Sequence, residues 1–120
     1  MRALANSAIG AALFTAACAQ STPSAKVDGA GFYGRAGLET KAEAEDAVQK
    51  ALEKSLSGRQ TQWRASNGDF GFVTPIETWK STSGHWCRQF VETVSIDGAT
   101  RDREAVACRV NGRWRLAKVL

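Results

Sequence analysis

Two dipeptides that favour tight β-hairpin turns, Asp97-Gly98 and Asn111-Gly112, place the strongest constraint on how this chain can fold. Apolar and polar side chains alternate around both dipeptides, as they do in strands that bury one face. A third dipeptide of this kind, Asn67-Gly68, lies closer to the middle of the chain. Residues 59–119 are therefore predicted to form a twisted antiparallel β-sheet of five or six strands.

The number of strands depends on Pro75, which cannot donate a backbone hydrogen bond. We expect Pro75 to end a short strand after the first turn, and Ile76–Lys80 to form a separate strand. If the Asn67-Gly68 turn is a two-residue loop, Trp63 faces Phe72 across the first hairpin.

The turn at Asp97-Gly98 also fixes a register in which two cysteines meet. With a two-residue loop, Ile96 pairs with Ala99, and nine pairs further from the turn Cys87 lies opposite Cys108. Such a pair is not hydrogen-bonded, and its Cα atoms lie about 4.5 Å apart. This separation falls within the range of disulfides, so the spacing predicts a cross-strand disulfide unless a β-bulge shifts the register.

The same register divides the side chains of the last three strands between two faces. One face, predicted to form the core, carries the following side chains: Trp86, Phe90, Val94, Ile96, Ala105, Ala107, Trp114 and Leu116. The opposite face, which holds both cysteines, is half apolar. We therefore expect a helix to cover the first face and the curvature of the sheet to shield part of the second.

The helix that could cover the core face is predicted at Thr40–Leu56. Thr40 and Glu43 have the spacing of a capping box, in which the threonine side chain caps the first turn. An alanine-rich apolar stripe recurs at helical spacing, at Ala44, Ala47, Val48, Ala51, Leu52 and Leu56. The expected fold of residues 39–120 is α+β, with this one helix packed on the sheet.

The first residues have the features of an export signal. A positive start is followed by a small, apolar run of about ten residues, which is too short to span a bilayer. Residues 1–17 are predicted to be a signal peptide, and residues 18–38 a flexible, Gly-rich tether. Cys18 is then the expected lipidation site, while Ala17-Cys18-Ala19 also fits cleavage after Ala19 by an ordinary signal peptidase.

The cysteine count supports lipidation. The chain has three cysteines, and an odd thiol in an exported protein needs an explanation. If Cys18 carries the lipid, Cys87 and Cys108 remain as an even pair in an oxidising compartment.

The sequence gives no pattern of catalytic or cofactor-binding residues. His85 is the only histidine, and we expect it to lie in a loop without a function. Glu92, Asp102 and Glu104 stand among arginines, as in cross-strand ion pairs. We expect no metal and no cofactor, and the net charge of +4 does not by itself indicate nucleic-acid binding.

Three aromatic residues form a candidate binding surface. If Trp63, Phe72 and Trp79 were exposed beside Arg64 or Lys80, they could stack on sugars of the cell wall or of lipopolysaccharide. Burial in the core is the more usual position for tryptophan.

The region from about residue 44 to residue 119 resembles the C-terminal domain of bacterial surface-antigen lipoproteins, related to the rickettsial 17 kDa surface antigen. The resemblance rests on these segments: Ala51-Leu52-Glu53, Ser57-Gly58, Trp63-Arg64, Gly68, Phe70–Pro75, Gly84, Cys87-Arg88, Gly98, Ala107-Cys108-Arg109 and Gly112-Arg113-Trp114.

This resemblance implies an outer-membrane location, a lipid anchor and pairing of Cys87 with Cys108, and it implies no enzymatic activity. The expected function is that of a non-enzymatic envelope lipoprotein with a structural or interaction role. The expected partners are the membrane, through palmitate or similar acyl chains, and other envelope components. The alternative is a binding module that recognises an envelope component or inhibits an enzyme.

Overall fold

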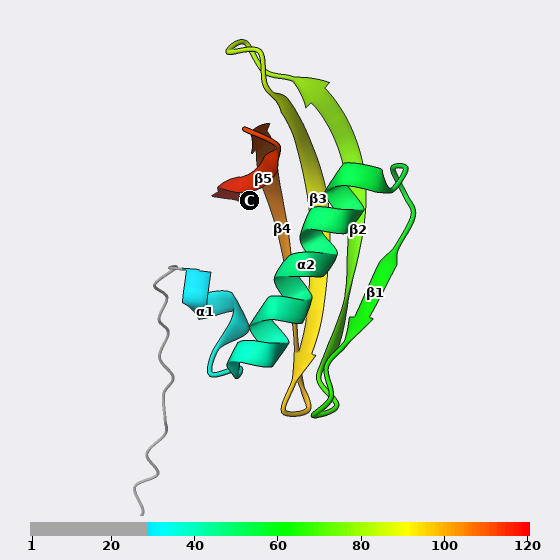
Figure 1. Cartoon of the computed structure of the whole chain (residues 1–120), viewed down its shortest axis with the longest axis vertical. Coiled ribbons are helices and arrows are strands. Elements are labelled where there is room, and N and C mark those ends of the chain that lie inside the picture. Colours follow the sequence, from blue (N-terminus) through cyan, green and yellow to red (C-terminus); the bar gives the residue numbers. More distant parts are fainter. Residues whose placement is uncertain (1–28) are drawn as a thin grey trace, which may run out of the picture.

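Strands occupy most of the chain after residue 60, and each pairs with its neighbour in sequence. The computed structural model describes residues 29–120, so the predicted signal peptide, Cys18 and most of the tether lie outside the described residues. The five antiparallel strands follow one another across a single sheet (Figure 1). They are β1 (Thr61–Arg64), β2 (Phe70–Lys80), β3 (Trp86–Ile96), β4 (Ala99–Val110) and β5 (Arg113–Val119).

Two helices precede the sheet, and the longer one crosses one of its faces. They are α1 (Gly29–Tyr33) and α2 (Leu38–Lys54). Figure 1 shows α2 lying obliquely over the middle strands, with α1 beside it. The predicted α+β fold, with one main helix on a five-stranded sheet, is confirmed. Within residues 29–120, neither helix has the length and apolar character needed to cross a membrane.

The predicted register of β3 and β4 is confirmed. Asp97 and Gly98 have φ angles of 55° and 81°, so they form a two-residue turn, and Ile96 pairs with Ala99. Nine pairs further along, Cys87 lies opposite Cys108, with 4.0 Å between their Cα atoms. The two cysteines form the predicted disulfide, which joins the strands at the end far from their turn.

The pairing of β4 with β5 also follows the prediction near the turn. Trp114 lies opposite Arg109, and Leu116 lies opposite Ala107. A β-bulge then shifts the register between Val106 and Ala107. The disulfide register is unaffected because this bulge lies in the β4–β5 ladder and not between β3 and β4.

The prediction that Pro75 separates two strands is wrong. β2 continues through Pro75 and contains a bulge just after it. The Pro75 carbonyl accepts a hydrogen bond from the Gly58 N–H (2.8 Å), which lies on the β1 side of β2. The nitrogen of Pro75 faces the same side. The β1–β2 ladder ends at the pair Thr61–Val73, so the missing N–H of Pro75 costs no hydrogen bond between strands.

The first hairpin differs from the two-residue prediction by one residue. The Ala65 N–H donates to the Asp69 carbonyl (2.8 Å), so the loop has three residues, and Gly68 has a φ of 100°. Trp63 consequently lies opposite Gly71, not Phe72. A shift of one residue moves a side chain to the other face of a sheet, which here places Trp63 under α2.

The predicted ends of the long helix are also corrected. α2 begins at Leu38 after Gly37, and Thr40 lies inside the helix, where its hydroxyl donates to the Asp69 carboxylate (2.7 Å). The capping box is therefore wrong, because tertiary packing uses the threonine side chain. Since α2 ends at Lys54, Leu56 lies beyond the apolar stripe and is 69% exposed.

The core lies between α2 and the concave face of the sheet. The helix contributes small side chains, which let it approach the strands closely, and the strands contribute most of the larger ones. The buried cluster comprises Ala44, Ala47, Ala51, Leu52, Trp63, Ala65, Val73, Phe90, Val94, Ala105, Ala107 and Trp114. The prediction that Trp86 belongs to the core is wrong. Trp86 is the first residue of β3, lies beyond the end of α2 and is 50% exposed.

Part of the predicted tether is ordered against the sheet. Phe32 and Tyr33 of α1 are half-buried and pack on the core cluster. Arg101 of β4 donates to the backbone carbonyls of Gly31 (2.9 Å) and Phe32 (3.0 Å). The flexible-tether prediction for residues 18–38 is therefore wrong from α1 onward, because the two aromatic side chains are buried by folding.

Candidate functional site: the helix-docking residues and the adjacent groove

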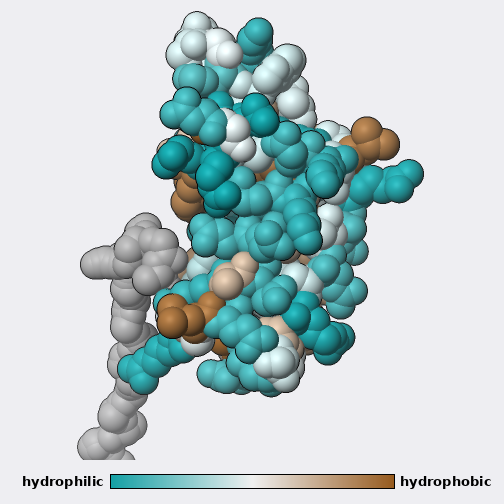
Figure 2. Space-filling model, viewed as in Figure 1, coloured by the Kyte–Doolittle hydropathy of each residue, from teal (hydrophilic) through white to brown (hydrophobic). Residues whose placement is uncertain are grey.

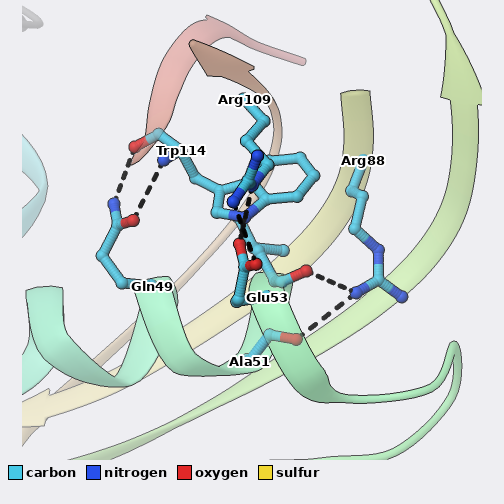
Figure 3. Close-up of polar contacts among 7 residues, drawn as sticks. Gln49, Ala51, Glu53, Arg88, Arg109 and Trp114 are labelled. Carbon is cyan, nitrogen blue, oxygen red and sulfur yellow. Dashed lines mark hydrogen bonds and ion pairs between the residues drawn. The ribbon is translucent and has the colours of Figure 1, made fainter. Parts of the chain in front are cut away.

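Arg88 of β3 binds the C-terminal end of α2 from beneath. Its Nη1 donates to the carbonyl oxygens of Leu52 (2.8 Å) and Ala51 (3.4 Å) (Figure 3). Its Nε donates to the Thr78 hydroxyl (2.8 Å). The last carbonyls of a helix lack partners within the helix and carry partial negative charge, so a cation is favourable there. Arg88 is almost fully buried, and this burial lowers the pKa of its guanidinium.

Glu53 and Gln49 on α2 bind the two strands nearest the C-terminus. The Glu53 carboxylate accepts two hydrogen bonds from Arg109 (2.9 and 3.2 Å) and one from the Trp114 indole (2.8 Å). These bonds lower the pKa of the Glu53 carboxyl group, and the hydrogen bond from Arg109 has the largest effect. The Gln49 side chain binds the backbone N–H and carbonyl of Trp114 (3.0 and 2.7 Å) as a neighbouring strand would (Figure 3).

Three strand residues thus hold α2 on the sheet. We call them the helix-docking residues: Arg88, Arg109 and Trp114. All three belong to the segments that carry the family resemblance, Cys87-Arg88, Ala107-Cys108-Arg109 and Gly112-Arg113-Trp114. The polar groups of Arg88 and Trp114 are buried or partly buried in contacts with α2, Thr78 and Ser57, while the Arg109 side chain, which binds Glu53, is 40% exposed. Three residues from the segments that carry the resemblance therefore have a structural role in this fold.

Replacing Arg88 by Met should lower the free energy of unfolding by about 2 kcal/mol, because the Leu52 carbonyl and the Thr78 hydroxyl lose their buried partner. The last turn of α2 should exchange its amide hydrogens faster. Chemical denaturation and hydrogen exchange measure the two effects. Arg115→Met, at an exposed position, serves as the control and should change stability by less than about 0.5 kcal/mol. Equal stability of the two variants would contradict the docking role.

A groove of about 370 Å³ lies beside the helix-docking residues, between α2 and β5. Phe90 and Ala107 form its floor, and Val48 and Trp114 form parts of its walls. Leu116 borders the groove and is 48% exposed. Most of the exposed lining is apolar, so the groove is suited to bind an apolar group, and Lys41, Glu45 and Gln49 of α2 add polar groups along one side.

Two residues that line the groove, Tyr33 and Arg103, hold a buried acid. Glu92 of β3 is fully buried, and Arg103 donates to its Oε1 through Nε (3.0 Å) and Nη2 (2.9 Å). The Tyr33 hydroxyl donates to Oε2 (2.5 Å), while the Arg103 guanidinium lies 4.2 Å from the centre of the Phe32 ring. Burial, together with the charge of Glu92, raises the pKa of Tyr33 well above its usual value.

This cluster confirms the predicted cross-strand ion pair of Glu92, with Arg103 as its partner. Because both carboxylate oxygens are engaged, Glu92 is not available as a general base in this arrangement. Asp102, also predicted in an ion pair, accepts a hydrogen bond from the Thr93 hydroxyl (2.7 Å). In residues 29–120, no three His, Cys, Asp or Glu side chains are grouped so that they could hold a metal ion.

The structure separates the three aromatic residues of the candidate binding surface. Trp63 is buried under α2, and its indole N–H has no hydrogen-bond partner. Phe72 and Trp79 lie on the opposite face of the sheet, where Phe72 is half-buried and Trp79 is 37% exposed. The predicted surface therefore loses Trp63, because the three-residue loop of the first hairpin turns it inward.

Sequence reasoning missed the buried Arg88 and Glu92. A signal was present, since both alternate in phase with Phe90 and Val94 along β3 and so occupy core-face positions. Charged residues at such positions need buried partners. The contribution of Tyr33 had a weaker signal, two adjacent aromatic residues within a Gly-rich segment.

Comparisons with known proteins find similarity to a family of surface antigens. The family model for the 17 kDa outer membrane surface antigen matches residues 50–115. The chain is 39% identical over 75 residues to the 17 kDa surface antigens of Rickettsia conorii and Rickettsia rickettsii, covering 61% of this chain and 47% of each relative. It is 40% identical over 67 residues to that of Rickettsia amblyommatis, covering 55% and 44%. The match spans about half the length of these relatives, and no solved structure matches the chain significantly.

Proposed function

Because the chain belongs to the 17 kDa outer membrane surface antigen family, we propose that it is a non-enzymatic lipoprotein of the bacterial outer membrane. Acyl chains on Cys18 hold it there, and the folded domain has a structural or interaction role at the membrane surface. The observation that carries the non-enzymatic part is the use of the helix-docking residues: the side chains most typical of the domain pack α2 on the sheet.

Two further observations support the envelope location. A disulfide in so small a domain is typical of proteins that fold in an oxidising compartment. The disulfide also uses two of the three cysteines, which leaves Cys18 after a signal-like segment as the one thiol for lipidation.

A second candidate function is binding of an envelope component, and the groove between α2 and β5 favours it. Its apolar floor at Phe90 and Ala107 and its exposed border at Leu116 suit a hydrophobic group of a ligand. Trp79 supplies an exposed aromatic ring on the other face.

Lipidation is tested by expressing the full chain in a Gram-negative bacterium and separating a detergent phase from the aqueous phase. The wild-type protein should enter the detergent phase, and Cys18→Ser should remain in the aqueous phase or keep its signal peptide. The matched control is the double variant Cys87→Ser/Cys108→Ser, which loses two thiols but keeps Cys18 and should still enter the detergent phase. A wild-type protein in the aqueous phase would contradict the proposal.

A further inference from the structure

One end of the sheet carries a row of residues that crosses four strands on the face away from α2. Trp79, Cys87, Cys108 and Arg115 are successive cross-strand partners in β2, β3, β4 and β5. Directly paired residues project from the same face, so the indole, the disulfide and the guanidinium share one surface. Within residues 29–120 no element covers this face of the sheet (Figure 1).

Two tryptophans are exposed at this end of the molecule. Trp79 is 37% exposed and Trp86 is 50% exposed, on opposite faces of the β2–β3 hairpin. Figure 1 shows this hairpin projecting past the end of α2. The Lys80 amine lies 5.5 Å from the centre of the Trp86 ring. Exposed aromatic side chains that packing does not require commonly mark an interaction site, and tryptophan is enriched at the membrane–water interface.

Three cations on β5 lie on the same face as Trp79. Arg113, Arg115 and Lys118 pair with Val110, Cys108 and Val106 on that face, where Val106 is buried and the other two are partly buried. All three cations are exposed, and none has an ion pair or a side-chain hydrogen bond within the described part of the chain. Two acids project from the same face: Glu77 lies in the cross-strand row that contains Lys118, and Glu104 lies two residues before Val106 on β4.

On the face shown in Figure 2, hydrophilic side chains predominate and hydrophobic ones are confined to small, separate areas. At the disulfide end, by contrast, the Trp79 indole shares a face with three cations that make no ion pair within the described residues, and the Trp86 indole projects from the other face of the same hairpin.

We infer that this end of the sheet binds an anionic lipid bilayer. We call it the disulfide-end surface and define it by Trp79, Trp86, Arg113, Arg115 and Lys118. The arginines and the lysine bind lipid phosphates, and the two indoles lie at the level of the headgroups. Charge complementarity favours this occupant over a second copy of the chain, because a second copy would bring like charges together. The inference goes beyond the anchor at Cys18 and does not depend on it.

The test measures sedimentation of the protein with lipid vesicles. It uses the full chain with Cys18→Ser, so that no acyl chain contributes to binding. The protein should bind vesicles of phosphatidylcholine containing about a third phosphatidylglycerol, bind pure phosphatidylcholine much more weakly, and dissociate as salt is raised. The triple variant Arg113→Gln/Arg115→Gln/Lys118→Gln should bind the anionic vesicles roughly 100-fold more weakly.

A matched triple variant distinguishes the loss of these particular cations from a general loss of net charge. Arg35→Gln/Lys50→Gln/Arg59→Gln removes the same number of arginines and lysines from exposed positions in and around the helical layer, where Lys50 makes only an exposed pair with Asp46. It should bind nearly as tightly as the parent. Equal weakening in both triple variants, or no binding by the parent chain, would overturn the inference.

Tryptophan fluorescence gives a second readout. Vesicle binding should shift the emission to shorter wavelength, and Trp79→Phe/Trp86→Phe should abolish the shift, since Trp63 and Trp114 are already buried. A shift that persists in this variant would overturn the role of the two indoles. A dimer that forms through these indoles, without vesicle binding, would assign the surface to a second copy and overturn the lipid assignment.

Discussion

Replacing Glu92 by Gln should lower the free energy of unfolding by about 3 kcal/mol, one of the largest effects of a single substitution in this domain. The Arg103 guanidinium would remain at a site where 14% of its side chain is exposed, without the carboxylate that now neutralises it. The amide would also replace one carboxylate oxygen by an NH2 donor, which would face either the Tyr33 hydroxyl or the Arg103 guanidinium.

Urea unfolding at pH 7 measures this effect, with Glu104→Gln as the control. Glu104 lies on the neighbouring strand, is exposed and has no ion pair within residues 29–120, so its replacement should change stability by less than about 0.5 kcal/mol. If Glu92→Gln and Glu104→Gln are equally stable, the Tyr33–Glu92–Arg103 cluster does not hold α1 and the sheet together.

Gly71→Ala should destabilise the domain by about 3 kcal/mol, near the upper end for overpacking. A Cβ atom at this position would lie 2.5 Å from the Thr93 carbonyl oxygen and 2.6 Å from the Trp63 indole nitrogen. Neither can move freely, because Thr93 belongs to the central strand β3 and Trp63 is packed under α2.

Gly37→Ala is the matched control for this substitution, since a Cβ there would meet nothing within 4 Å. Its cost should stay below about 1 kcal/mol, the loss expected from alanine at the residue before a helix. Thermal unfolding monitored by tryptophan fluorescence compares the two variants. A Gly71→Ala protein as stable as Gly37→Ala would mean that Trp63 does not pack against Gly71.

The register of the last three strands could be predicted because local sequence determines it. Asp97-Gly98 and Asn111-Gly112 both adopt positive φ angles, and a two-residue loop leaves only one pairing for the strands that it joins. Asn67-Gly68 carries the same signal but stands in a three-residue loop, since Asp69 closes the turn by accepting from Ala65. Local sequence did not distinguish these loop lengths, and Trp63 was assigned to the wrong cross-strand partner.

Tertiary contacts decide the features that could not be predicted. Thr40 has the spacing of a helix cap, but the Asp69 carboxylate competes for its hydroxyl from another element. Phe32 and Tyr33 stand in a Gly-rich segment and are ordered only because Arg101 and Glu92 provide partners for α1. The groove likewise arises where α2 leaves part of the sheet uncovered, which no single segment of the sequence encodes.

The helix-docking residues explain how a family resemblance can be specific without indicating an activity. Arg88 must reach two helix carbonyls and Thr78, and Glu53 must accept from Arg109 and Trp114 together. Each contact requires a particular side chain at a particular register position. Motifs of this kind therefore identify the fold, and exposed residues such as Leu116 and Trp79 take no part in these contacts.

The intact mass of the mature protein, extracted from membranes without reductant, tests the proposed anchored and disulfide-bonded lipoprotein most directly. The account predicts a chain that starts at Cys18, carries added acyl chains and lacks two hydrogens because Cys87 and Cys108 are joined. An unmodified chain that starts at Gln20 would contradict the lipid anchor, and the groove and the disulfide-end surface would then belong to an unanchored binding domain.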